Sequence, residues 1–216
     1  MTSARLVRWV LKPALVLVGL GPITWLLWGA ATNGLGANPI STITKETGTW
    51  TLRCLAATLA ITPLRRLTGW QDLIRARRMV GLFAFFYGSL HFLTYIWLDQ
   101  FFAIDEIVKD IGKRPFITAG FTAFSLMVPL ALTSTTAWIR RLGGRRWQRL
   151  HRLIYASAMA GVVHYWWLVK ADVQRPQIYA AVIGTLLAYR LVVAYARRSA
   201  KVVTPKLSPR SSGLSA

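Results

Sequence analysis

The chain has 216 residues, of which 54% are hydrophobic and only 16% are charged. Soluble domains usually carry about a quarter charged residues, so this composition excludes an ordinary soluble globule. A net charge of +20 would suit nucleic-acid binding, but the basic residues fall in the gaps between apolar blocks, as they do in membrane proteins. We therefore expect a protein embedded in a lipid bilayer, with no nucleic acid as partner.

Six apolar blocks follow one another along the chain, and each is long enough to predict a membrane-spanning helix. The first block follows a basic arm and resembles a signal peptide, but five further spans identify it as an uncleaved first helix. The second is the weakest, because Arg53 lies inside it and Pro63 closes it. The sixth contains Arg190, which we expect to snorkel toward the nearby basic end. The blocks cover residues 13–31, 48–64, 79–98, 115–133, 151–169 and 177–195.

The charges between the blocks predict how the helices are oriented. Basic residues are concentrated in the N-terminal arm, in the loops 65–78 and 140–152, and after residue 196, whereas six of the seven acidic residues lie in the other connections. By the positive-inside rule, both termini and the two basic loops are cytoplasmic. The predicted fold class is all-α: a polytopic membrane helix bundle with six transmembrane helices.

The connections and the ends carry few other signals. The outer connection 98–115 is expected to hold a short amphipathic helix, whose acidic face is either a solvated surface or a docking surface for a partner outside the cytoplasm. The tail from Lys201 is rich in serine and proline and is expected to be disordered, which gives one domain over 1–200 and a tail over 201–216. Cys54 is the single cysteine, so it excludes an internal disulfide and is interpreted as a small buried side chain.

Two of the three histidines lie at matched depths in the third and fifth predicted spans. His91 follows the basic inner end of its span by thirteen residues, and His164 lies near the outer end of the other. At 1.5 Å of rise per residue, each is about 9–12 Å from the outer boundary. Two facing imidazoles suit the axial positions of a haem iron, whereas zinc would need more ligands at the same level. The alternative is that each histidine only bonds a neighbouring helix. Small residues precede each of these histidines. They would let a flat macrocycle approach the backbone of both helices, or they serve only the close packing of membrane helices. These residues are Gly88, Ser89, Ala160 and Gly161.

The third histidine, His151, lies thirteen residues before His164, which is about 20 Å toward the cytoplasmic face of a helix. On an ideal helix that spacing places the two imidazoles about 140° apart, so they do not share one face. The geometry leaves two interpretations open for His151: a ligand of a second haem, or a polar residue at the membrane interface.

Several segments of the chain match a known family in order and spacing: NGLGANPI, ATLAITPLRR, RARRMVGLFAFFYGSLHFLTY, KRPFITAG and LGGRRWQRLHRLIYASAMAGVVHYWW. In these segments the chain resembles the MsrQ family. Its members are haem-binding membrane subunits of the periplasmic methionine sulfoxide reductase systems of Gram-negative bacteria, within the ferric reductase-like transmembrane domain superfamily. The resemblance covers nearly the whole chain up to about residue 200.

The resemblance implies haem b bound by His91, His151 and His164, and FMN as a further cofactor. It also implies a place in the bacterial inner membrane, where electrons pass from the quinone pool to a periplasmic molybdopterin-dependent methionine sulfoxide reductase subunit that repairs oxidised proteins. The superfamily carries two histidines on each ligand helix. Here Arg78 stands thirteen residues before His91, so the number of haems stays open.

We therefore expect an electron-transfer subunit with no substrate chemistry of its own. No Gly-rich phosphate loop is present, so the donor is expected to be membrane quinol or a separate cytoplasmic flavin reductase. Arg78 is a candidate for an inner cofactor site. Two alternatives are a cytochrome b anchor for another periplasmic oxidoreductase and a haem-free transporter or structural membrane protein.

Overall fold

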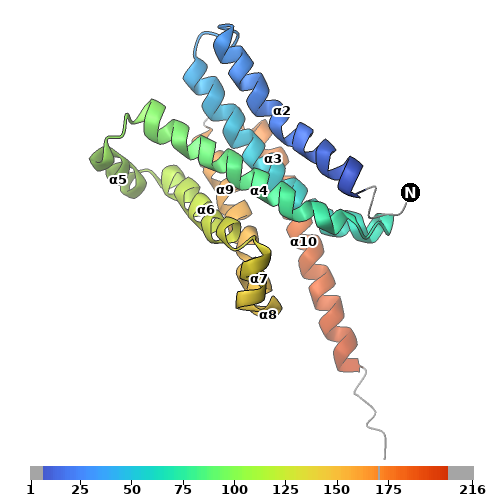
Figure 1. Ribbon diagram of the computed structural model, residues 1–216. Coiled ribbons are helices and arrows are strands. Elements are labelled where there is room, and N and C mark those ends of the chain that lie inside the picture. Colours follow the sequence, from blue (N-terminus) through green and yellow to red (C-terminus); the bar gives the residue numbers. More distant parts are fainter. Residues whose placement is uncertain (1–6, 170, 204–216) are drawn as a thin grey trace, which may run out of the picture.

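The computed structural model describes residues 7–169 and 171–203, and this part of the chain is helical without a β-strand (Figure 1). Each predicted span overlaps one long helix, with bounds that differ for some of them. A π-helical turn (Val7–Leu11) precedes α2, and a second π-helical segment (Thr94–Asp99) extends α4. The α-helices are α2 (Lys12–Ala31), α3 (Pro39–Thr68), α4 (Leu73–Leu93), α5 (Ile104–Lys113), α6 (Pro115–Leu132), α7 (Thr136–Leu142), α8 (Gly144–Leu150), α9 (Leu153–Leu168) and α10 (Gln174–Val203).

Four helical stretches in the described residues are long and apolar enough to cross a membrane: Trp9–Ala31, Leu73–Asp99, Pro115–Leu132 and Gln174–Arg197. This confirms the all-helical membrane class, while the count of six spans stays a prediction. The other two helices depart from the pattern for different reasons. α9 has 16 residues, and α3 is polar for a spanning helix, with Arg53 and a series of threonines.

Several threonines of α3 are compatible with an apolar surrounding, because their hydroxyls bond within the helix itself, whereas Thr62 Oγ1 is buried without a partner among the described residues. Thr47 donates to the carbonyl of Ile43 at 2.8 Å, and Thr58 donates to that of Cys54 at 2.7 Å. Each of these two hydroxyls is therefore satisfied without a partner from another helix. Thr58 and Cys54 are also buried in the protein, so the expectation of a small buried cysteine is confirmed.

The ends of α3 follow common local signals. Asn38 caps its N-terminus, where the side-chain Oδ1 accepts a hydrogen bond from the Ser41 amide at 3.0 Å, and Pro39 occupies the first turn. Gly69 ends the helix in the left-handed conformation, with φ 71°, which glycine adopts without strain. α3 is thereby a single 30-residue helix that runs the length of the bundle.

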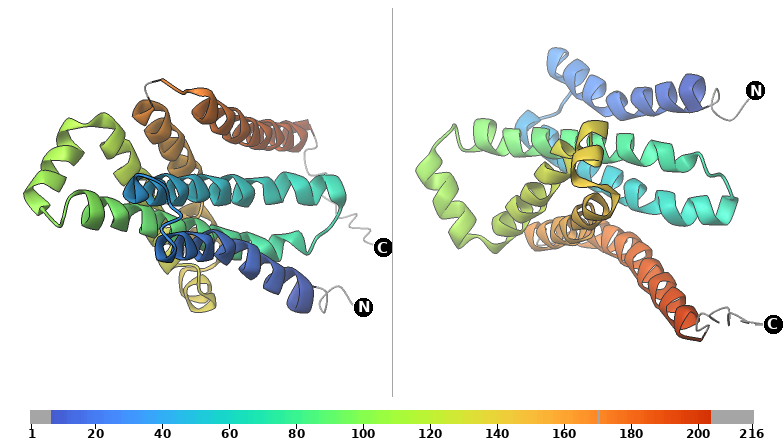
Figure 2. Two further views of the ribbon diagram at one scale, coloured as in Figure 1. Left: turned by 90° about the horizontal axis from the view of Figure 1, so that it is seen from above. Right: turned by 60° about the horizontal axis from the view of Figure 1, so that its bottom comes forward.

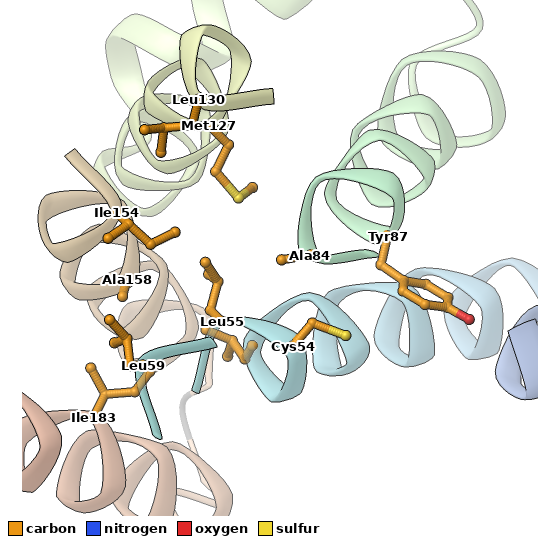
Figure 3. Close-up of a cluster of buried hydrophobic side chains, with 11 residues drawn as sticks. Cys54, Leu55, Leu59, Ala84, Tyr87, Met127, Leu130, Ile154, Ala158 and Ile183 are labelled. Atoms are coloured by element: carbon orange, nitrogen blue, oxygen red, sulfur yellow. The ribbon is translucent and has the colours of Figure 1, made fainter. Parts of the chain in front are cut away.

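The bundle is built around α3, which packs along α4, while α6 packs along α9 (Figure 2). α10 lies against both α3 and α9, and α2 covers α3 and α4 from the other side. Leu55 and Leu59 of α3 are nearly inaccessible and lie at the centre of the core (Figure 3). The other helices contribute Ala84 and Tyr87 from α4, Met127 and Leu130 from α6, Ile154 and Ala158 from α9, and Ile183 from α10.

The outer connection holds the amphipathic helix that its sequence predicts. α5 buries Ile107, and Asp110 fixes the helix by accepting hydrogen bonds from Tyr95 at 3.3 Å and Gln100 at 3.2 Å. Arg114 forms an ion pair with the same carboxylate at 3.2 Å. The idea that α5 docks a partner stays a prediction.

Three boundaries differ from those expected. The basic segment 140–152 is not a loop but contains the end of α7 and all of α8, separated by Gly143 with φ 73°. The chain turns at His151 and Arg152, and α9 begins only at Leu153, so the prediction of a continuous helix over 151–169 is wrong at its start. α10 continues to Val203, three residues into the expected tail, and the arm up to residue 6 and the tail from 204 lie outside the described residues.

Candidate metal centre

His91 of α4 and His164 of α9 face each other toward the end of the bundle that carries α5, which is called the outer end here, as opposed to the inner end that carries α7 and α8. Their ring centroids are 6.0 Å apart and the ring planes meet at 72°. Both side chains are half-buried. The prediction that the two histidines lie at the same depth is therefore confirmed, and it holds because α4 and α9 both run from the inner to the outer end.

Each imidazole is oriented by a backbone carbonyl of the neighbouring helix. The Nδ1–H of His91 donates to the Thr44 carbonyl at 2.9 Å, and the Nδ1–H of His164 donates to the Phe116 carbonyl at 2.6 Å. A carbonyl oxygen only accepts, so Nδ1 carries the proton in both rings and the lone pair lies on Nε2. This tautomer is the one that a histidine needs to bind a metal through Nε2.

A glycine four residues after each carbonyl makes room for the ring. Gly48 follows Thr44, and a Cβ added there would lie 3.0 Å from Cε1 of His91. Gly120 follows Phe116, and a Cβ there would lie 2.7 Å from Nδ1 of His164. Any larger residue would push the imidazole away from the carbonyl that orients it. The same local device, a carbonyl with a glycine one turn later, thus appears in TKETG and in FITAG.

The small residues singled out in the sequence serve other purposes. A Cβ on Gly88 would meet the side chain of Met127 at 2.8 Å, and a Cβ on Gly161 would meet Leu52 at 3.2 Å. Both glycines therefore let helices pack closely, which is the alternative that the sequence left open. Sequence reasoning missed Gly48 and Gly120, because a backbone carbonyl followed by a glycine four residues later carries no distinctive residue pattern.

The donor set fits a haem iron held by two axial imidazoles. Bonds from a metal to imidazole nitrogen are about 2 Å long, and each ring centre lies one ring radius beyond its nitrogen. Two such bonds in line therefore place the ring centres about 6 Å apart. The observed separation of 6.0 Å agrees with this value, and both rings offer neutral Nε2 atoms. The histidines come from different helix pairs, α3 with α4 and α6 with α9, so neither pair alone supplies both ligands.

His151 does not join this pair. It precedes α9 at the inner end, where its ring stacks on Trp147 with centroids 3.8 Å apart. Its Nε2 lies 3.1 Å from the hydroxyl of Thr133, and the Trp147 indole N–H donates to the Thr133 carbonyl at 2.8 Å. Nε2, which carries the lone pair in the other two histidines, is therefore engaged by protein in His151.

Arginines crowd the same inner end, in a different arrangement from the expected one. Arg78 is exposed, whereas Arg77 is half-buried and its charge acts on the His151 ring. The expectation that Arg190 snorkels toward the basic end stays a prediction. Its guanidinium has partners inside the protein: it donates to the Tyr155 hydroxyl and to the Leu59 carbonyl, both at 2.8 Å. Arg190 thereby joins α10 to α9 and α3, because partners inside the protein lie within its reach.

Apolar helices that bring two oriented imidazoles together define a membrane protein of the kind that holds a metal cofactor between helices. Comparison with known proteins agrees with this class. The profile of the family described as "Ferric reductase like transmembrane component" matches residues 47–162, a stretch that includes both His91 and His151. No solved structure shows a significant match.

Three relatives are named "Protein-methionine-sulfoxide reductase heme-binding subunit MsrQ". The protein from Herminiimonas arsenicoxydans is 52% identical over 192 residues, which cover 88% of each chain. That from Azospira oryzae is 56% identical over 183 residues, covering 84% of this chain and 78% of the relative. The protein from Bordetella pertussis is 50% identical over a match that covers 88% of this chain and 93% of the relative. The chain belongs to the ferric reductase like transmembrane component family and, within it, to the MsrQ family.

Proposed function

We propose that this protein is a b-type cytochrome subunit that passes electrons across the outer half of a bacterial inner membrane. The observation that carries the proposal is the pair of His91 and His164, with centroids 6.0 Å apart and both Nδ1 atoms bonded to carbonyls. When bound there, haem supplies one-electron redox chemistry at its iron. The two imidazoles would fill both axial positions, so the chain relays electrons and performs no substrate chemistry.

The proposed topology has six transmembrane helices, with both termini in the cytoplasm and residues 1–200 as one domain. α3 and α9 complete the six beside the four apolar spans. The clustering of arginines at the end of the bundle that holds His151 supports a cytoplasmic position for that end. The histidine pair then lies toward the periplasm, next to the acidic outer connection.

The electron acceptor that we propose is a periplasmic molybdopterin-dependent methionine sulfoxide reductase subunit. The names of the relatives support it, since they describe subunits of a protein-methionine-sulfoxide reductase. The proposed donor is membrane quinol, with a cytoplasmic flavin reductase as the alternative. Repair of oxidised periplasmic proteins is the resulting role.

For the inner end we propose a second cofactor site that involves His151, with FMN as the further cofactor that the family resemblance implies. Ligation through Nε2 of His151 requires that this nitrogen leave the Thr133 hydroxyl, which lies 3.1 Å away. Arg77, whose charge acts on His151, is a better candidate than the exposed Arg78 for a contact to an acidic group of such a cofactor.

The test is the absorption spectrum of the protein purified in detergent. We expect a low-spin b-type spectrum, and we expect it to be lost or strongly reduced in His91→Ala and in His164→Ala, because each change leaves one axial position empty. An unaltered low-spin spectrum in either variant would refute the pair. A haem-free transporter or structural protein would show no Soret band at all.

A further inference from the structure

A groove between α2 and α3 runs along the bundle at the level of the histidine pair, on the opposite face of α3. Its volume is about 520 Å³, and its walls include Val18, Pro22 and Trp25 of α2 and Glu46, Trp50 and Arg53 of α3. Val18 is 65% exposed and Trp25 is 53% exposed, so the groove opens on the surface that faces lipid. A ligand that reaches it would come from the bilayer.

Two opposite charges face this groove without a counterion. Glu46 and Arg53 are seven residues apart, two helical turns and about 10 Å along α3. Within residues 7–169 and 171–203 no ion pair or hydrogen bond involves either side chain, and the Arg53 guanidinium lies 4.6 Å from the centroid of the Trp50 ring. Ionisable groups on a membrane-embedded surface are costly and usually functional. A lipid acyl chain would leave both charges unpaired.

A proline in the opposite wall adds an acceptor. Pro22 lies inside α2 and has no amide hydrogen, so the Val18 carbonyl lacks the partner that it would have in a regular helix. Both residues line the groove. The groove thus combines two indole side chains with a carboxylate, a guanidinium and a carbonyl whose regular helix partner is absent.

We propose that this groove binds the head group of a membrane hydroquinone, a flat lipid-soluble donor of two electrons and two protons. The ring would stack on Trp50 and Trp25, one hydroxyl would donate to the Glu46 carboxylate, and Arg53 would donate to the oxygen at the other end. The apolar tail would leave the groove past Val18 into the bilayer. This inference rests on the proposed function, because the electrons need the site between His91 and His164.

The groove and the histidine pair are separated by a single helix. Gly48, which supports the His91 ring, lies two residues before Trp50 on α3. The Trp50 ring is 6.1 Å from that of Tyr87, one turn before His91 on α4. Electrons therefore have only one layer of side chains and backbone to cross.

The reaction balances with the proposed partners. Hydroquinone loses two O–H hydrogens and becomes quinone, which releases two electrons and two protons. His91 and His164 would hold the group that accepts these electrons one at a time, and the periplasmic reductase would take them up. One proton passes to Glu46, the eighth residue of α3 from its outer end, and the other to water on that side. Methionine sulfoxide finally takes up two electrons and two protons and yields thioether and water.

The binding test is photolabelling of the purified protein in nanodiscs with an azidoquinone, followed by peptide mapping. We expect the label on α2 and α3, and we expect decylubiquinone to compete for it but added phospholipid not to. In Arg53→Gln the concentration of decylubiquinone needed for competition should rise about tenfold, because one charged hydrogen bond is lost. The matched control is Lys45→Gln, since Lys45 is an exposed neighbour that does not line the groove.

The second measurement separates binding from proton transfer. Glu46→Gln should bind decylubiquinone but slow haem reduction by decylubiquinol about tenfold or more, while dithionite reduction and the low-spin spectrum stay unchanged. Label elsewhere, equal competition by phospholipid, or unchanged kinetics in Glu46→Gln would overturn the proposal. Labelling requires no haem, so a protein without a Soret band that still labels in the groove would refute the proposed function and leave the binding site standing.

Discussion

The outer and inner ends of the bundle both present histidine, but they use its two nitrogens differently. At the outer end, His91 and His164 give Nδ1–H to carbonyls, and Nε2 of each ring has no hydrogen bond to any residue that the structure describes. At the inner end, His151 has Nε2 beside the Thr133 hydroxyl and its ring against Trp147. The same side chain is prepared for a ligand role at one end and held by protein at the other. Its role follows from the partner of the second nitrogen, not from its position in an apolar segment.

The two ends also differ in how charge is handled. Within the part of the chain that the structure describes, the outer pair has no hydrogen bond to an arginine, and its helices are joined through backbone carbonyls. The inner end is joined by the half-buried guanidinium of Arg190, which has partners for two of its nitrogens, while its Nε has none within the described residues. The outer end is therefore shaped for a neutral pair of ligands, and the inner end carries an excess of positive charge.

The comparison requires that the two ends face opposite sides of the membrane. Reporter fusions placed within 98–115 and within 140–149 should report opposite compartments, the first periplasmic and the second cytoplasmic. The effect is all-or-none for each fusion, because a reporter domain is either translocated or not. If both fusions report the same side, the outer and inner assignments fail.

The outer end should depend sharply on its two glycines. Gly120→Ala is expected to lower haem retention about tenfold or more, because the new Cβ would lie 2.7 Å from the His164 ring and force it to move. Gly48→Ala should have a smaller effect, since its Cβ would lie 3.0 Å from the His91 ring. The measurement is the ratio of Soret to protein absorbance after purification. Gly184→Ala is the control, because a Cβ there meets nothing within 4 Å; equal losses in all three variants would contradict the role of the glycines.

The inner end should lose stability when Arg190 is replaced by leucine. The change removes two hydrogen bonds from a charged donor and leaves the Tyr155 hydroxyl and the Leu59 carbonyl without it, which costs about 2 kcal/mol. Thermal unfolding in detergent would measure the effect, with the exposed Arg197→Leu on the same helix as control. The folded fraction should keep the low-spin spectrum of the outer pair. Equal melting temperatures for the two variants would show that Arg190 does not brace the helices.

The smallest change is expected for His151. His151→Ala should leave the spectrum of the outer haem unaltered, because His151 contacts Trp147 and Thr133 and neither of the outer histidines. If a second inner haem is present, the same variant should lower the haem content without changing the outer low-spin signal. Loss of the whole low-spin spectrum in His151→Ala would mean that His151 belongs to the same site as His91 and His164, and it would contradict the distinction between the two ends.

The sequence by itself determined where the helices lie and at what depth two histidines meet. Runs of apolar residues set the positions of the helices along the chain, because hydropathy and length are local properties. The constant rise of a helix set the matched depth of the two histidines, and the 6.0 Å separation of the His91 and His164 rings agrees with it. The start of α9 was less predictable, since the apolar run extends to His151 although the chain turns there.

Only the tertiary structure decided which nitrogen of each histidine is free and which arginine is buried. The partners are remote: the carbonyls lie 47 and 48 residues from their histidines, and Leu59 lies 131 residues from Arg190. A backbone carbonyl has the same chemistry in every residue, so no pattern of residue types marks the one that will orient an imidazole. Gly48 and Gly120 acquired their role for the same reason. A missing side chain matters only when another helix brings a ring to the space that it leaves.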